Sequence, residues 1–528
     1  MILPDTPKVG PNPPDVQFRK EEGSFFTSKK WILILILAGI VLRLAQYLAN
    51  RSLWVDEVYL AFNIADRSFA GLLQPLDNYQ AAPIGFLMAE KLAFLALGNN
   101  EYALRLFPLL SSILSLILFA WVAMKTLRPK AVPIALALFA ILAPLIYYAS
   151  EVKQYSSDLT IALLLYLLAL NALQNEMSIA RAAMIGILGG IAIWFSHPSV
   201  FLLAGAGTTL LVRYIVRKEW KNVCLLFIPL SLLGASFAAL FLVSLRHLVH
   251  HGSLLPYWGS AFAPFPPLSM WSVKWYIDTF FKLFADPTGL FLVGIGGFAF
   301  LAGILVMSSE NRENALLLGS PVGFALIASA LHKYPFEGRL LLFAVPAVLF
   351  FIGAGAERII EKTKHIPGNA GYVFLGLLFL HPLFSAGNNL IHPQEREEIK
   401  PVMSHIMANH RPGDILYMYS SAQYAFRYYS NRYGFKEGDY IIATWSRDNW
   451  KKYDEDMDKL SGNKRVWVLF SHIWNGSGVN EEKYFLNHLN SMGKRLDALK
   501  KTGASVYLYD LSKPPATNQA QPGIEPTS

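Results

Sequence analysis

Two adjacent carboxylates, Asp56 and Glu57, stand just after the first long apolar run of the chain and close to Trp54. A carboxylate in such a place can act as a general base, taking a proton from a nucleophile as it attacks. The alternative is structural, because either acid could cap a short helix or simply meet water. We therefore treat Asp56 and Glu57 as candidate catalytic residues and ask which other groups share their side of the molecule.

A third acid, Glu151, lies with Lys153 and Tyr155 in a polar break between two apolar runs. A charged side chain in the middle of a bilayer costs about 2.5 to 3.5 kcal/mol on insertion scales, so the chain must reach the membrane surface here. Glu151 is a candidate catalytic group, and Lys153 could hold Glu151 or meet a substrate. The alternative is an ordinary polar turn with an internal ion pair.

A third stretch, residues 331–339, combines ring side chains with two fixed cations. It contains His332, Lys333, Tyr334 and Arg339. Arginine and lysine suit an anionic phosphate, arginine as a bidentate fork and lysine as a point charge. The alternative is an interfacial turn whose cations meet lipid headgroups. The stretch is a candidate phosphate-binding segment.

The elements that must position these groups are membrane helices. Of the 528 residues, 54% are hydrophobic and only 16% are charged, and the apolar runs have the length of about 17 to 25 residues that spans a bilayer. A soluble enzyme is excluded. The net charge of +9 is spread over short loops and tails, so it gives no reason to expect nucleic acid as a partner. We count about eleven apolar runs, at 31–49, 103–124, 132–148, 157–173, 183–196, 198–216, 223–244, 289–307, 314–331, 339–356 and 371–386.

The orientation of the bundle follows from the distribution of Lys and Arg. These residues gather in the segments that are cytoplasmic if the N-terminus is cytoplasmic, which is the positive-inside pattern. An odd number of spans then places the C-terminal region outside the membrane. The predicted parts of the chain are a cytoplasmic N-terminal tail (1–30), a transmembrane bundle (31–387) with outer loops at 50–102 and 246–288, an extracytoplasmic α/β domain (388–512) and a disordered tail (513–528).

The α/β domain is predicted from alternating patterns after residue 388. Strand patterns at 414–419, 440–445, 465–470 and 505–511 alternate with helix patterns at 394–409, 422–432, 449–460 and 481–492. Gly503 is expected to turn a final antiparallel hairpin. The fold class is thus a polytopic α-helical membrane protein with a C-terminal extracytoplasmic α/β domain.

Taken in order, these stretches resemble the GT-C membrane glycosyltransferases that use polyprenyl-phosphate sugars. Within that superfamily they are similar to the protein O-mannosyltransferases and aminoarabinose transferases, and to glycosyltransferase family 39. The resemblance covers residues 30–385. It rests on the acids Asp56-Glu57, a Pro-containing amphipathic segment at 81–87, Arg105-Leu106-Phe107-Pro108, Glu151-Val152-Lys153-Gln154-Tyr155 with lysine in place of the family's arginine, and a late turn ending at Arg339 before Pro346. One departure is Gln80-Ala81-Ala82 before Pro83, where the aminoarabinose transferases have an acid and a lysine.

The resemblance implies a hexosyl- or pentosyltransferase that moves a sugar from a polyprenyl-phosphate donor to a lipid, glycan or protein acceptor, with inversion. The reaction would take place at the outer face of a bacterial plasma (inner) membrane, among membrane lipids. Asp56 would be the base, and Glu57 and Glu151 further catalytic acids. The donor would meet Lys153, Tyr155, His332, Lys333, Tyr334 and Arg339. No cofactor is required, although a divalent cation would fit beside the acids.

Two alternatives of other classes remain open at this point. A polyprenyl-lipid carrier without glycosyl-transfer chemistry would use the same cations for phosphate, and would be expected to show broken spans and inverted repeats. An interaction protein would place its function in the outer domain and use the bundle as a scaffold. We find no internal repeat in the sequence.

Overall fold

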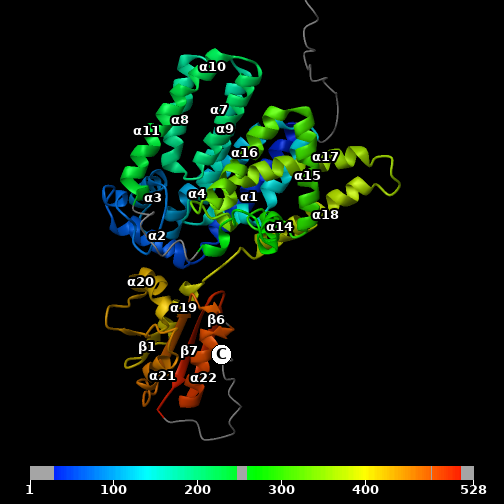
Figure 1. Ribbon diagram of the computed structural model, residues 1–528. Helices are drawn as coiled ribbons and strands as arrows, with labels where there is room; N and C mark the ends of the chain where they lie inside the picture. The colour runs from blue at the N-terminus through cyan, green and yellow to red at the C-terminus, as the bar shows by residue number, and fades with distance from the viewer. Residues whose placement is uncertain (1–28, 247–257, 477, 513–528) are drawn as a thin grey trace, which may run out of the picture.

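The computed structural model describes residues 29–246, 258–476 and 478–512. A bundle of helices forms one part of the molecule, and a domain built on a mixed sheet lies against one end of it (Figure 1). The predicted disordered tail at 513–528 and nearly all of the predicted cytoplasmic tail at 1–30 lie outside the described residues.

The bundle is that of a polytopic membrane protein. Among the described residues, nine helical segments are long and apolar enough to cross a membrane, and a bent pair would make ten. The nine are α1 (Lys29–Leu48), α4 (Glu101–Thr126), α7 (Tyr155–Gln174), α9 (Ser199–Val216), the segment Trp220–Leu245 that contains α10 (Trp220–Leu225) and α11 (Phe227–Leu240), α15 (Val293–Glu310), α16 (Arg312–Ala330), the segment Gly338–Lys362 that contains η6 (Gly338–Ala344) and α17 (Val345–Lys362), and α18 (Ala370–Ile391).

The eleven predicted runs are all helical, and two of them differ from straight full spans. Run 183–196 falls in α8 (Ile179–Phe195), which at 17 residues is about 25 Å long and shorter than the bilayer core. Run 132–148 is bent by 56° between α5 (Ala131–Ile141) and α6 (Ala143–Tyr147). Pro144 lies in the first turn of α6, where its missing N–H is tolerated, but it could not continue α5 without breaking the hydrogen-bond ladder.

The outer loops contain helices that lie outside the set of spans. The loop after α1 forms α2 (Val55–Asp66) and the amphipathic α3 (Ile84–Leu97), and the later loop contains α14 (Met270–Ala285). Residues 247–257 of that later loop lie outside the described residues. The break after α6 passes through η3 (Tyr148–Ser150) and brings the chain out of the bundle next to α2, because the backbone N–H of Val152 donates to Glu57 in that helix.

The C-terminal domain has a five-stranded sheet in the order β2-β1-β3-β7-β6. The strands β1 (Ile415–Met418), β2 (Tyr440–Ile442) and β3 (Val466–Ser471) are parallel, and β7 (Ala504–Asp510) is antiparallel to β3 and to β6 (Lys494–Lys501). The helices are α19 (Ile399–Asn409), α20 (Gln423–Ser430), α21 (Lys451–Asp458) and α22 (Glu481–Met492). Gly503, at φ +63°, turns the β6–β7 hairpin as expected.

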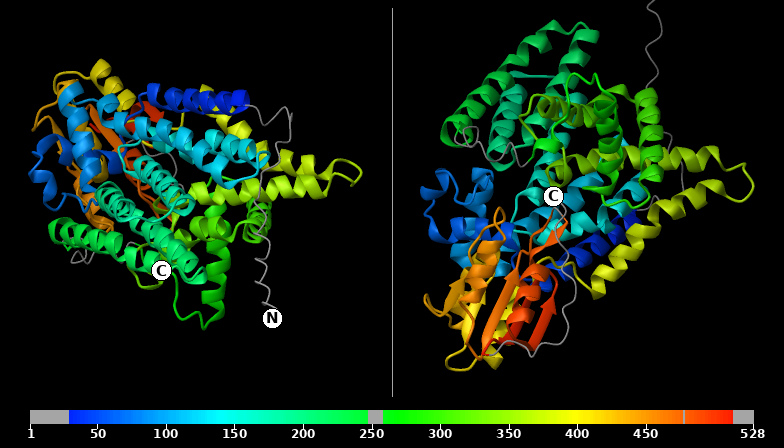
Figure 2. Two further views of the ribbon diagram at one scale, coloured as in Figure 1. Left: turned by 90° about the horizontal axis from the view of Figure 1, so that it is seen from above. Right: turned by 60° about the horizontal axis from the view of Figure 1, so that its bottom comes forward.

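The core of this domain continues into the first outer loop. One cluster of buried apolar side chains joins Leu53 and Val58 of the loop with Tyr419, Phe426 and Tyr429 of the domain. Figure 2 shows the domain beside α2 and α3. Burial of apolar surface stabilises a folded structure in proportion to the area removed from water. This shared cluster therefore holds the domain against the loop that carries Asp56.

Candidate active site

Glu57 is the structural centre of the candidate site. Its side chain is fully buried, and its carboxylate accepts hydrogen bonds from Arg51 (2.8 Å), Arg105 (2.8 and 2.9 Å) and the backbone N–H of Val152 (2.9 Å). Burial alone would raise the pKa of Glu57, but the charges of Arg105 and Arg51 hold that pKa below its usual range. Glu57 therefore ties together the first outer loop, the start of α4 and the 151–155 break. Its predicted catalytic role stays a prediction.

Asp56, one position earlier on α2, has different surroundings. Its side chain is 21% exposed and forms an ion pair with Arg339, with 2.5 Å between Oδ2 and Nη2. Burial would raise the pKa of Asp56, but the charges of Lys153 and Arg339 outweigh it and hold the pKa below its usual range. Asp56 is thus ionised at neutral pH and accessible, which a general base requires.

Glu151 and Lys153 come to the same place from the break between α6 and α7. Glu151 is fully buried; its Oε1 accepts a hydrogen bond from Trp54 Nε1 (2.8 Å), and its Oε2 has no partner among the described residues. Burial, followed by the charge of Glu57, raises the pKa of Glu151. Lys153 donates to Gln80 Oε1 (2.5 Å), and burial lowers its pKa. The acceptor of this hydrogen bond from Lys153, Gln80, stands in the stretch where the sequence departs from the aminoarabinose transferases.

The late turn contributes Arg339 to this cluster. The guanidinium of Arg339 lies over the rings of Trp54 (5.4 Å) and Tyr155 (5.6 Å), and its Nη1 has no hydrogen-bond partner among the described residues. Tyr334 instead donates to the backbone carbonyl of Leu340 (2.7 Å).

The first residues of that turn are not brought into contact with the cluster. The side chains of His332 and Lys333 are exposed, and the His332 ring lies against Phe262 at 5.0 Å. Their predicted contact with the donor stays a prediction, as does that of Tyr334. Of the residues singled out from the turn, Arg339 alone has contacts in the described structure with Asp56, Trp54 and Tyr155.

The sequence analysis missed three residues that the C-terminal domain adds. Arg396, between α18 and α19, stacks its guanidinium on the rings of Trp54 (4.3 Å) and Tyr147 (4.8 Å). Glu397 accepts from the backbone N–H of Val55 (3.0 Å) and pairs with His472 Nδ1 (2.7 Å). These residues follow the change of composition near residue 388, which indicates a separate domain and gives no sign that the domain reaches the bundle.

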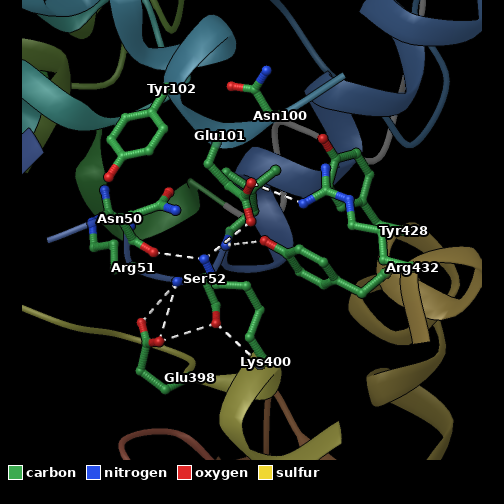
Figure 3. A network of polar contacts seen from close by, with 12 residues as sticks. Asn50, Arg51, Ser52, Asn100, Glu101, Tyr102, Glu398, Lys400, Tyr428 and Arg432 are labelled. Carbon is green, nitrogen blue, oxygen red and sulfur yellow. Dashed lines mark hydrogen bonds and ion pairs between the residues drawn. The ribbon is translucent and has the colours of Figure 1, made fainter. Parts of the chain in front are cut away.

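Polar contacts also fasten the domain to the segment before α2 and to the start of α4 (Figure 3). Glu398 accepts from the backbone N–H of Ser52 (2.9 and 3.2 Å) and from its hydroxyl (3.0 Å). Glu101, at the start of α4, pairs with Lys400 (3.1 Å) and Arg432 (2.9 Å). The candidate site therefore lies between one end of the helix bundle and the C-terminal domain.

A metal site is not evident in the described part of the chain. No group of three or more His, Cys, Asp and Glu side chains is placed there to hold a metal ion. The acids of the cluster are instead paired with arginine and with the indole N–H of Trp54.

Comparison with known proteins gives the fold. No protein-family model matches the sequence, and no curated protein matches it. Among solved structures, ArnT from Cupriavidus metallidurans bound to undecaprenyl phosphate is 13% identical, with a TM-score of 0.52 over 91% of this chain and 98% of that chain. The same protein in the apo state is 13% identical to this chain, with a TM-score of 0.51. An Archaeoglobus fulgidus oligosaccharyltransferase, in complex with Zn and sulfate, is 12% identical, with a TM-score of 0.50 over 91% of this chain and 73% of that chain.

The fold is therefore the one that these two membrane transferases share, the GT-C fold that the resemblance predicted. The chain is an integral membrane protein with this architecture and a C-terminal domain built on a sheet. The likeness extends over the C-terminal domain as well as the bundle, because it covers nine tenths of the chain.

Proposed function

We propose that the protein is a glycosyltransferase that moves a sugar from a polyprenyl-phosphate donor to an acceptor at the outer face of a bacterial inner membrane. The observation that carries the proposal is the ionised and accessible Asp56, held beside Lys153 and Arg339 where the spanning helices end. A lipid donor suits this position, because its tail can stay in the bilayer while its phosphate and sugar reach the cluster.

The proposed reaction is a single displacement that inverts the anomeric carbon. The acceptor nucleophile gives its proton to Asp56 and attacks that carbon, the bond from the carbon to the phosphate oxygen breaks, and polyprenyl phosphate leaves. Arg339 and Lys153 stabilise the charge that builds on the leaving phosphate. Glu57 and Glu151 act as positioning residues, Glu57 through its arginines and Glu151 through Trp54.

The substrate classes are proposed more broadly. Binding of undecaprenyl phosphate by ArnT, which has the same fold, supports a polyprenyl-phosphate-linked donor for this chain. The sugar is a hexose or a pentose, and the acceptor is a lipid, a glycan or a protein. The C-terminal domain is the part of the molecule that would contact the acceptor, because the segment that begins it lies next to Asp56, where Glu397 accepts from the backbone N–H of Val55.

The proposal is tested by donor turnover. Purified full-length protein in detergent is incubated with synthetic undecaprenyl-phosphate hexoses and pentoses, and released undecaprenyl phosphate is measured by mass spectrometry, with extracts of outer-membrane lipids and glycans as acceptors. We expect release with at least one donor. Binding of these donors without any release, with or without acceptor extract, would contradict a transferase and support a polyprenyl-lipid carrier.

A further inference from the structure

Arg396 is a half-buried cation whose side-chain N–H groups have no hydrogen-bond acceptor among the described residues. Its guanidinium lies between the rings of Trp54 and Tyr147, at 4.3 and 4.8 Å, and its side chain is half-buried. It donates no hydrogen bond and forms no ion pair with another described residue. An arginine has five N–H donors in a planar fork, so a half-buried guanidinium held only by two rings is left with donors for a ligand.

The charges around Arg396 come from both cations and acids. Lys153, Arg339 and Arg396 bring three positive charges to the cluster, and Asp56, Glu151 and Asp286 are the acids that act on them. Glu57 adds no net negative charge, because Arg51 and Arg105 both pair with it. Burial raises the pKa of Glu151 and of Asp286 and lowers the pKa of Lys153, so the guanidiniums of Arg339 and Arg396 are the fixed charges of the cluster.

A second cation of the cluster also has a free donor. Nη1 of Arg339 is buried and has no partner among the described residues, and Arg339 lies over the Trp54 ring that Arg396 also contacts. The charges of the two guanidiniums are close enough to oppose each other. Two neighbouring guanidiniums with unused donors are the arrangement in which an anion replaces repulsion by charge-assisted hydrogen bonds.

The backbone around Arg396 is clamped on both sides. Glu397 and Glu398 accept from the backbone N–H groups of Val55 and Ser52, at 3.0 and 2.9 Å, on the loop that carries Asp56. On the other side the β6–β7 hairpin packs against the segment, since a Cβ at Gly503 would lie 2.0 Å from the carbonyl oxygen of Arg396. The position of Arg396 thus depends on docking of the C-terminal domain.

We propose that Arg396 binds the phosphate of the polyprenyl donor together with Arg339, so that the C-terminal domain supplies part of the donor site. This inference rests on the proposed function, because it takes the anion to be the donor phosphate. The ligand class is a phosphate ester on a long apolar chain. Glu398 acts as a positioning residue, since it holds the backbone that carries Arg396 and touches no ligand.

The experiment measures binding of two probes to the purified full-length protein in detergent. The first probe is undecaprenyl phosphate, and the second is undecaprenol, which has the same tail without the phosphate. The variants are Arg396→Ala, Arg396→Lys and Glu398→Ala. The matched control is Arg427→Ala, which removes an exposed arginine of the same domain that stacks on Phe62 (5.6 Å) outside the cluster.

We expect Arg396→Ala to weaken binding of undecaprenyl phosphate about 10- to 100-fold, the effect of a lost charge-assisted hydrogen bond, and to leave undecaprenol binding unchanged. Arg396→Lys should restore part of the loss, because the charge returns without the fork. Glu398→Ala should weaken phosphate binding in the same direction, and Arg427→Ala should change neither probe.

Two results would overturn the inference while the proposed function stands. One is a wild-type preference for undecaprenyl phosphate that Arg396→Ala leaves intact. The other is an equal loss for both probes, which would mean that Arg396 supports the structure alone. If the wild-type protein itself bound undecaprenyl phosphate no better than undecaprenol, the proposed donor would be wrong, and the proposed function would fail with it.

Discussion

At the scale of single residues, Asp56 and Glu57 are neighbours on one helix turn that have different surroundings. Successive helical positions point about 100° apart, at 3.6 residues per turn. Glu57 faces the interior and meets two arginines, whereas Asp56 faces the opening and meets Arg339. The two acids of one sequence motif therefore have different surroundings in the fold, and Asp56 is the one that we propose as the base.

We expect Asp56→Asn to abolish donor turnover while the protein stays folded and inserted. The amide keeps the size and hydrogen-bonding reach of the side chain but cannot take a proton. The loss should be about 10²- to 10⁴-fold and should appear in kcat rather than in KM. Initial rates with the donor found in the turnover assay check this, and near-normal kcat would refute the role of Asp56 as base.

Glu57→Gln should instead destabilise the protein. Removal of this charge leaves Arg51 and Arg105, both buried, without their counter-ion, and breaking a buried ion pair from one side costs about 3 to 5 kcal/mol. Thermal unfolding in detergent should show a clearly lower Tm than for wild type and for Asp56→Asn. An unchanged Tm together with lost turnover would return Glu57 to the catalytic role predicted from the sequence.

Trp54 joins the two halves of the cluster, and its substitutions separate them. Trp54→Phe keeps a ring for Arg396 and Arg339 but removes the indole N–H that donates to the buried Glu151. We expect this variant to lower Tm and to keep most of the binding of undecaprenyl phosphate. Trp54→Ala should lower Tm and should also lose the binding of undecaprenyl phosphate. Equal phosphate binding in the two variants would show that the ring plays no part in holding the arginines.

At the scale of elements, the sequence analysis predicted most of the fold correctly. Hydrophobic run length is a strong signal, and every predicted run is a helix in the structure. The four predicted strands and four predicted helices of the C-terminal domain are present. β6 was implied by the hairpin expected at Gly503 but was given no strand pattern of its own, because Lys494–Lys501 is rich in charged residues; it pairs on one side with β7 at the edge of the sheet. Edge strands lack the apolar alternation on which strand prediction relies.

The parts of the site that escaped prediction depend on contacts between distant elements. Asp56, Glu151 and Arg339 stand in motifs, and the fold brings them together. Arg396 and His472 stand in no motif, and their roles follow from the docking of the domain on the first outer loop. The contact from Arg432 to Glu101, 331 residues apart, is an example. Pattern reasoning along the chain has no access to such pairs.

Docking of the domain is tested at Glu101, where α4 meets both Lys400 and Arg432. Glu101→Gln removes the charge that holds both cations and should loosen α19 and the segment before it. We expect faster amide hydrogen exchange over residues 396–400 and weaker binding of undecaprenyl phosphate. The control is Glu437→Gln, an exposed acid of the same domain. Unchanged exchange in Glu101→Gln would show that the apolar cluster alone holds the domain.

At the scale of the whole molecule, the two ends of the bundle have different charge patterns. α4 begins beside the C-terminal domain and runs for 26 residues, about 39 Å, so the turn after it lies at the far end. There Glu310 of α15 pairs with Arg128, in the turn after α4, and with Arg358 of α17. The positive-inside rule predicts that this end is cytoplasmic and that the C-terminal domain is outside.

This orientation can be checked with two matched single-cysteine variants, because Cys224 is the one native cysteine. In a Cys224→Ala background, Lys364→Cys marks the exposed turn between α17 and α18, and Lys436→Cys marks an exposed loop of the C-terminal domain. A membrane-impermeant maleimide applied to intact bacterial spheroplasts should label Lys436→Cys at once and Lys364→Cys only after lysis. If the order were reversed, Asp56 would face the cytoplasm, and a donor presented at the outer face could not reach it.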